Sequence, residues 1–99
     1  MLFAVSYRVR PNATEESQKR ALALFANWKP PTEYVFKAHY SYADGTGGLA
    51  LVETDSAVAA LQVHGAWTPF FEFKAVPVVE IEKAVQIGFG NVQWRESVK

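Results

Sequence analysis

A glycine-rich segment lies near the middle of the chain, at Asp44-Gly45-Thr46-Gly47-Gly48. Glycine adopts the positive φ angles that tight hairpin turns require, and Asp at the start of such a segment favours a turn. The segment is flanked by an alternating stretch at 34–42 and by an apolar stretch at 49–53. The sequence therefore predicts two antiparallel strands joined by this turn, and the other elements have to be arranged around that hairpin.

The part of the chain before the hairpin has the pattern of a strand followed by a helix. Residues 2–10 alternate between apolar and mixed side chains, which is typical of a strand. Pro11 ends that strand, and Asn12 followed by Glu15 resembles a capping box. A helix is expected over 13–28, where apolar residues recur at helical spacing before two prolines that cannot continue the helix.

The part of the chain after the hairpin repeats this order. Thr54 or Asp55 can cap a second, alanine-rich helix, which Gly65 is expected to end. A fourth strand is expected over 71–80 and contains Pro77. Because proline donates no hydrogen bond to a neighbouring strand, this strand belongs at an edge of the sheet or carries a bulge.

These segments predict the order β-α-β-β-α-β within a single domain that covers residues 1–99. Two right-handed crossovers joined by a hairpin give an antiparallel four-stranded sheet with both helices on one face, the ferredoxin-like α+β arrangement. The second and fourth strands are then the edges. A short third helix is expected from Ile81 to about Phe89, followed by a loose tail at 91–99 that contains Trp94.

The face of the sheet that the two helices leave uncovered is expected to be apolar. The side chains assigned to it are Leu2, Ala4, Ala50, Val52, Val76 and Val78. A sheet face in contact with water is normally more polar than this. We therefore expect a second copy of the chain to cover this face, so that two sheets pack against each other in a symmetric homodimer.

Charge and composition exclude several classes of function. Ten Lys and Arg balance ten Asp and Glu, so no basic surface for nucleic acid or for an anionic membrane is expected. The chain has no cysteine and only two histidines, and we expect no disulfide, no metal site and no other cofactor. No apolar run approaches the roughly 20 residues of a transmembrane helix, and residues 1–10 lack the pattern of a secretion signal. A cytoplasmic location is therefore expected.

Three motifs make the chain resemble a known family. They are MLFAVSYRVRP at 1–11, DGTGG at 44–48 leading into LVETD at 51–55, and FKAVPV at 73–78. In their order and spacing they resemble the small bacterial family called domain of unknown function 3303, from residue 2 to about residue 85. That family looks like a branch of the dimeric α/β-barrel proteins, whose relatives include antibiotic-biosynthesis monooxygenases, muconolactone isomerases and haem-degrading enzymes. The resemblance implies a ferredoxin-like fold and a homodimer, and it implies no particular activity or site residue.

The aromatic side chains indicate a ligand pocket between the sheet and the helices. Tyr7, Trp28, Tyr40 and Trp67 are expected to line it and to accept a small aromatic or apolar metabolite. Buried tyrosine hydroxyls need hydrogen-bond partners, and few buried polar residues are available, so some hydroxyls should face water or a ligand. The alternative is that these aromatic residues fill the core of a small domain.

The two histidines are the weak candidates for catalysis. His39 is expected on the face of the second strand opposite Phe36 and Tyr40, where an imidazole can act as a general base or hold a polar group of a ligand. The alternative is a solvated or interface histidine. His64 is expected in the last turn of the second helix, where the helix dipole favours its cationic form and gives it a capping role.

Three functions fit these observations. The first is a homodimer that binds a small aromatic or apolar metabolite between sheet and helices. The second is an enzyme on the same pocket, a cofactor-free monooxygenase or isomerase. The third is a non-catalytic dimeric module that recruits a protein partner. Two histidines without a compact acid–base set favour binding over catalysis.

Overall fold

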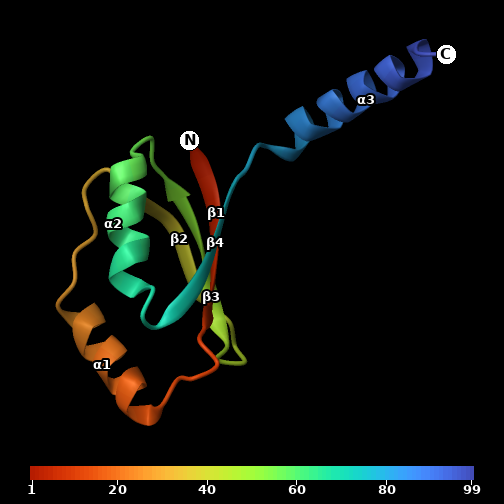
Figure 1. The fold of residues 1–99 in the computed structure, drawn as a ribbon. Helices are drawn as coiled ribbons and strands as arrows, with labels where there is room; N and C mark the ends of the chain where they lie inside the picture. The colour runs from red at the N-terminus through yellow and green to blue at the C-terminus, as the bar shows by residue number, and fades with distance from the viewer.

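A computed structural model describes residues 1–99 as a four-stranded antiparallel sheet with three helices. The elements in chain order are β1 (Leu2–Val9), α1 (Glu15–Ala26), β2 (Val35–Ser41), β3 (Gly47–Glu53), α2 (Ala57–Trp67), β4 (Phe71–Pro77) and α3 (Ile81–Ser97). The strand order is β2-β3-β1-β4, and α1 and α2 lie on the same side of the sheet (Figure 1). This is the ferredoxin-like α+β fold with a C-terminal helix, as predicted. The prediction that β2 and β4 are the edge strands, with Pro77 on one of them, is also confirmed.

The predicted hairpin joins β2 to β3. Asp44 accepts hydrogen bonds from the backbone nitrogen and the hydroxyl of Thr46, at 3.0 and 2.7 Å, and these bonds lower the pKa of the Asp44 carboxyl. Gly45 has a φ of 77°, the left-handed conformation that glycine adopts most easily. At Gly47 a Cβ atom would overlap the carbonyl oxygen of Tyr7, so this position requires glycine because β1 approaches too closely for any side chain.

A bulge in β2 changes which side chains face the helices. The pairing of β2 with β3 shifts between Phe36 and Ala38, so Phe36 lies opposite Val52 and His39 lies opposite Ala50. Directly opposed residues of antiparallel strands share a face, and one extra residue reverses the alternation beyond it. The prediction that His39 lies opposite Phe36 across the sheet is therefore wrong, because both side chains face the helices.

The buried core lies between α2 and the centre of the sheet. It consists of Val5, Tyr34, Ala50, Val52, Ala59 and Val63. The assignment of Ala50 and Val52 to the uncovered face is wrong: both are at most 2% exposed and face α2. The uncovered face carries Leu49 and Leu51 instead, each 37% exposed, with Leu51 opposite Ala4 of β1.

The helix starts also differ from the sequence prediction. The hydroxyl of Thr14 accepts a hydrogen bond from the Ser17 backbone nitrogen and forms a capping box with Ser17, two residues later than the predicted Asn12 cap. Ser56, rather than Thr54 or Asp55, caps α2 by accepting from the backbone nitrogen of Ala59. Several residues near each start can serve as caps, so the local sequence does not single one out. Gly65 lies inside α2, which continues to Trp67.

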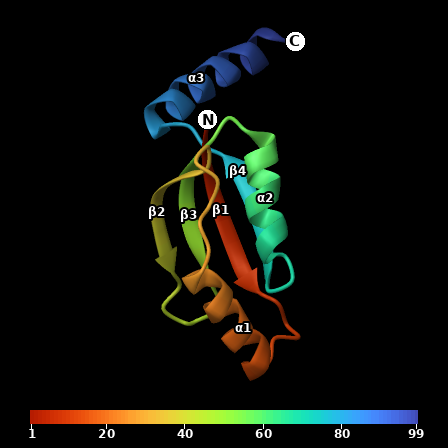
Figure 2. The same cartoon turned by 90° about the vertical axis from the view of Figure 1, so that its left-hand side faces the viewer.

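The third helix projects away from the rest of the molecule (Figure 2). The Val78 backbone nitrogen still donates to the Leu2 carbonyl at the end of the sheet, and α3 begins three residues later. It continues to Ser97, so the segment predicted as a loose tail at 91–99 is helical almost to its end. No residue of α3 is buried, and Phe89 and Trp94 are 70% and 67% exposed. None of the three helices has the length and apolar character needed to cross a membrane.

Candidate functional site

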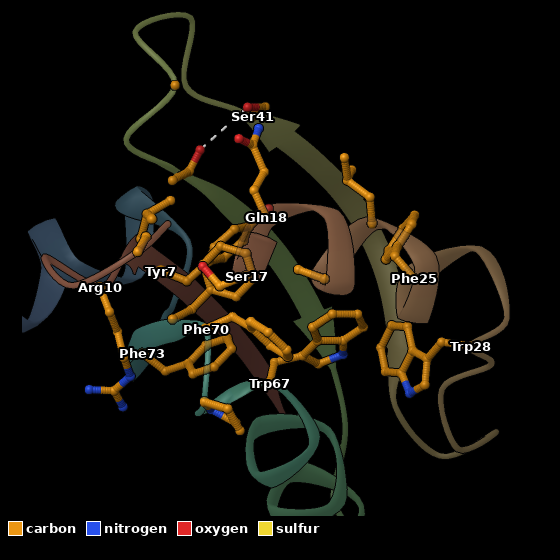
Figure 3. Close-up of a pocket in the computed structure, with 18 of the residues that line it drawn as sticks. Tyr7, Arg10, Ser17, Gln18, Phe25, Trp28, Ser41, Trp67, Phe70 and Phe73 are labelled. Atoms are coloured by element: carbon orange, nitrogen blue, oxygen red, sulfur yellow. Dashed lines mark hydrogen bonds between the residues drawn. The ribbon is translucent and has the colours of Figure 1, made fainter. Parts of the chain in front are cut away.

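A cavity of about 690 Å³ lies between α1 and the inner face of the sheet, and Figure 3 shows its walls. Hydrophobic side chains form most of its lining. The cavity exists because α1 stands off the sheet: no residue of α1 is buried, and its Leu22 and Phe25 are 64% and 56% exposed. A small domain would normally bury such side chains in a closed core.

Aromatic rings form the end of the cavity near the start of β4. The rings of Trp28 and Trp67 meet edge to face with centroids 5.3 Å apart, and Phe25 lies 6.1 Å from Trp67. The structure places three of the four predicted pocket residues, Tyr7, Trp28 and Trp67, on this cavity. Tyr40 does not line it. The bulge in β2 turns Tyr40 to the uncovered face of the sheet, where it lies opposite Leu49 and is 68% exposed.

One polar pair faces the cavity from the sheet. The hydroxyl of Tyr7 lies 2.7 Å from Nε2 of His39, and we call these two residues the open pair. His39 stacks on Phe36 with ring centroids 5.2 Å apart and planes 16° apart. Burial raises the pKa of Tyr7, with a further contribution from Tyr42, and burial lowers the pKa of His39. Both members of the pair are therefore uncharged at neutral pH.

The phenol ring of Tyr7 occupies space that a glycine leaves free. Tyr7 on β1 is directly opposite Gly48 on β3, and a Cβ atom on Gly48 would overlap the Tyr7 hydroxyl. The absence of a side chain at this position lets the phenol ring lie over the sheet and reach His39 on β2. The edge-to-face contact of Tyr7 with Phe71, at 5.1 Å, supports the ring from the other side.

A second Tyr and His form a similar pair under α2. The hydroxyl of Tyr34 lies 3.0 Å from Nε2 of His64, and we call these residues the closed pair. His64 stacks on Phe73 with centroids 5.1 Å apart, and Tyr34 is only 4% exposed. Burial raises the pKa of Tyr34 and lowers that of His64. His64 does lie in the last turn of α2, but its ring bonds Tyr34 and its cationic form is disfavoured, so the expected capping role is wrong.

The chain matches the family model described as Domain of unknown function (DUF3303) over residues 1–91. The protein belongs to the DUF3303 family. The match covers the whole sheet, α1, α2 and the first part of α3, so both pairs and the cavity lie inside it. No curated protein sequence matches the chain significantly.

The remaining polar groups around the cavity of this DUF3303 protein are mostly occupied. Arg10 lines the cavity, but its Nε donates to the carbonyl of Thr68 and its Nη1 lies 3.8 Å from the Glu72 carboxylate. No three His, Asp or Glu side chains come together in a way that would hold a metal ion. The cavity is thus a mainly apolar, aromatic space with one uncharged phenol–imidazole pair on its sheet side and with Asn12, Glu15 and Gln18 also on its wall.

Reasoning from the sequence identified the two histidines but neither hydrogen bond. The open pair joins β1 to β2, which are not neighbours in the sheet, across the glycine at position 48 of β3 between them. Gly48 was one signal in the sequence for such a contact, because a glycine inside a predicted strand often marks a place where another group approaches closely. The bulge in β2 that turns His39 towards Tyr7 could not be predicted from the sequence.

Proposed function

We propose that this DUF3303 protein binds a small planar aromatic or apolar metabolite in the cavity between α1 and the sheet. The observation that carries the proposal is the cavity of about 690 Å³ with mainly hydrophobic walls, which α1 leaves open although its lining includes the core residues Val5, Tyr34, Ala50 and Val63. Ligand sites typically measure about 300–1,000 Å³ and combine apolar walls with a few polar groups. A flat ligand is favoured because the Trp28 and Trp67 rings offer extended aromatic surfaces.

The proposal is tested by filling the cavity from α1. Ala21 lines the cavity, whereas Ala23 on the same helix is exposed and does not line it. Naphthalene serves as a planar two-ring probe, and its affinity is measured by equilibrium dialysis. We expect Ala21→Trp to weaken binding about tenfold or more, because the indole takes the space of the ligand, and Ala23→Trp to leave it unchanged. Equal binding by both variants, or no binding by the unaltered protein, would contradict the proposal.

We also propose that a second copy of the chain covers the outer face of the sheet, which is the face opposite α1 and α2. This face presents Leu49, Leu51 and Val76, which are 37%, 37% and 43% exposed, next to the largely exposed ring of Tyr40. Two such faces can pack about 10 Å apart with their side chains interdigitated, which removes these apolar groups from water. Helix α3 projects on the side of the sheet away from α1 and α2 (Figure 1), and its exposed Ile81, Phe89 and Trp94 add to the apolar surface that a second copy can contact.

The homodimer is tested with one buried charge. Leu51→Lys places an ammonium in the centre of the proposed interface, and Leu61→Lys makes the same change on α2, where Leu61 is 73% exposed. Native mass spectrometry should show a dimer for the unaltered chain and for Leu61→Lys, and a monomer for Leu51→Lys. A monomer in all three samples would overturn this assembly.

Proton transfer to a bound ligand is a second candidate function, and the open pair favours it. An uncharged imidazole can accept a proton and a phenol can donate one, which are the two roles that a cofactor-free isomerase or monooxygenase needs. Tyr7 and His39 supply both at 2.7 Å on the cavity wall. His64 forms the same kind of hydrogen bond with Tyr34, but it does not line this cavity.

A further inference from the structure

The open pair is held in place before any ligand arrives. His39 is stacked on Phe36, and the Tyr7 ring is supported by Phe71 and lies over Gly48. Their hydrogen bond of 2.7 Å links the two rings into one unit. Groups with fixed positions bind a partner at a smaller entropic cost than groups that must first be ordered. This arrangement is typical of a recognition point rather than of side chains that only fill space.

The hydrogen-bonding capacity of the pair is not exhausted by its internal bond. A tyrosine hydroxyl has one donor and two acceptor positions, and a neutral histidine has one donor and one acceptor. If Tyr7 donates to His39, the Tyr7 oxygen can still accept a hydrogen bond; if His39 donates, the Tyr7 hydrogen is free. In both arrangements the Tyr7 hydroxyl has a position left for a ligand. Tyr7 and His39 both line the cavity, so a ligand there can reach it.

The charged groups near the open pair indicate which class of ligand the cavity can accept. Arg10 is the cationic side chain on the cavity wall, and it is already engaged by the Thr68 carbonyl and by Glu72. His39 is uncharged at neutral pH, because burial lowers its pKa. A carboxylate or phosphate would therefore lose its hydration without gaining a free cation. The cavity favours an uncharged polar group.

We propose that Tyr7 and His39 bind the hydroxyl of a planar aromatic ligand, so that the cavity selects phenols over the corresponding hydrocarbons and over aromatic acids. This inference rests on the proposed ligand-binding function and adds the chemical class of the ligand. The aromatic part lies along the rings around Trp28 and Trp67, and the hydroxyl reaches the Tyr7 oxygen. The phenol O–H donates to Tyr7, which in turn donates to His39 Nε2.

Three probes of similar size test the selection: 2-naphthol, naphthalene and 2-naphthoate. Equilibrium dialysis at about pH 7.5 keeps the naphthol neutral and the naphthoate ionised. We expect 2-naphthol to bind about tenfold tighter than naphthalene, because one hydrogen bond is added, and 2-naphthoate to bind more weakly than either. Tyr7→Phe should remove the advantage of 2-naphthol, so that this variant binds 2-naphthol and naphthalene with equal affinity. Tyr40→Phe, the same change on the outer face, should alter neither affinity.

A second variant tests the open pair independently, in case Tyr7→Phe alters the fold. His39→Phe keeps an aromatic ring over Phe36 and removes the acceptor for the Tyr7 hydrogen, and we expect it to reduce the advantage of 2-naphthol severalfold. If the unaltered protein binds naphthalene and 2-naphthol equally, this inference fails while the ligand-binding function stands. A preference for 2-naphthol that survives both Tyr7→Phe and His39→Phe also overturns it. If neither probe binds, the proposed function itself fails.

Discussion

The molecule contains two pairs of the same composition in different surroundings. The closed pair, Tyr34 and His64, lies under α2, where Tyr34 is 4% exposed and belongs to the buried core. The open pair, Tyr7 and His39, has a hydrogen bond of similar length, but both of its side chains line the large cavity, whereas of the closed pair only Tyr34 does. The types of residue therefore do not determine the role of such a pair. Its role depends on how closely a helix covers it.

The covering helices differ in the side chains that face the sheet. Helix α2 presents the small Ala59 together with Val63, and both are at most 4% exposed in the core against the sheet. Helix α1 presents the larger Leu22 and Phe25, which remain more than half exposed, and the space beneath α1 stays open. Packing under α2 buries Tyr34 of the closed pair, and the distance of α1 from the sheet leaves both residues of the open pair on the cavity wall.

Removing the tyrosine of each pair gives the largest expected difference between them. Tyr34→Ala should lower the free energy of unfolding by about 3–5 kcal/mol, because it leaves a void in the core and an unpaired His64. Tyr7→Ala should cost about half as much, because that ring already borders an open cavity and its loss creates less new empty volume. Urea unfolding followed by circular dichroism measures both. Equal losses would show that the region around Tyr7 is packed as tightly as the core.

Gly48 allows a smaller and more local change to the open pair. Gly48→Ala places a methyl group against the Tyr7 hydroxyl and near the backbone oxygen of Tyr40. We expect a loss of about 1–3 kcal/mol from overpacking, together with loss of the preference for 2-naphthol as Tyr7 is displaced. Gly65→Ala is the matched control in α2, since nothing lies within 4 Å of its added Cβ atom. That change should stabilise the helix by up to about 1 kcal/mol. A neutral Gly48→Ala would mean that Tyr7 does not need this space.

The sequence was sufficient for the arrangement of elements because the required signals are local. Alternating strands, helix-breaking prolines and the turn at 44–48 gave the order of elements, and Pro77 pointed to an edge strand. Register was harder to predict. The extra residue in β2 moved side chains to the other face, since a shift of one residue reverses a strand, and the alternation of β3 alone did not show which of its two apolar faces packs against α2. The third helix was predicted to end at about Phe89, yet α3 continues to Ser97.

The candidate site was only partly predictable for the same reason. Tyr7, Trp28 and Trp67 could be assigned to a pocket from their aromatic character and their position on inward-facing elements. The pairing of Tyr7 with His39 depends on the bulge, and the cavity depends on how far α1 stands from the sheet. Neither is encoded in a short motif. Both result from packing between segments that are distant in the sequence.

The smallest expected effect concerns pH and separates the two histidines. Burial lowers the pKa of both His39 and His64 from the ordinary value of 6.5. As the pH falls below that value, the unfolded chain binds protons that the folded chain does not. The contribution of the two histidines to the free energy of unfolding is therefore largest above about pH 6.5 and decreases as the pH falls towards the folded-state pKa values. Urea unfolding at about pH 7.5 and about pH 5 measures this decrease.

Each histidine contributes separately to this decrease in the free energy of unfolding, and the two contributions should differ. His64 is half-buried against Phe73, whereas His39 is exposed where it borders the cavity. We therefore expect His64→Gln to flatten the pH dependence more than His39→Gln, when each variant is compared with itself at the two pH values. A ligand that occupies the cavity should reverse this order, because it removes water from His39 and lowers its pKa further. If His39→Gln already has the larger effect without ligand, the open pair is less accessible to water than its position at the cavity indicates.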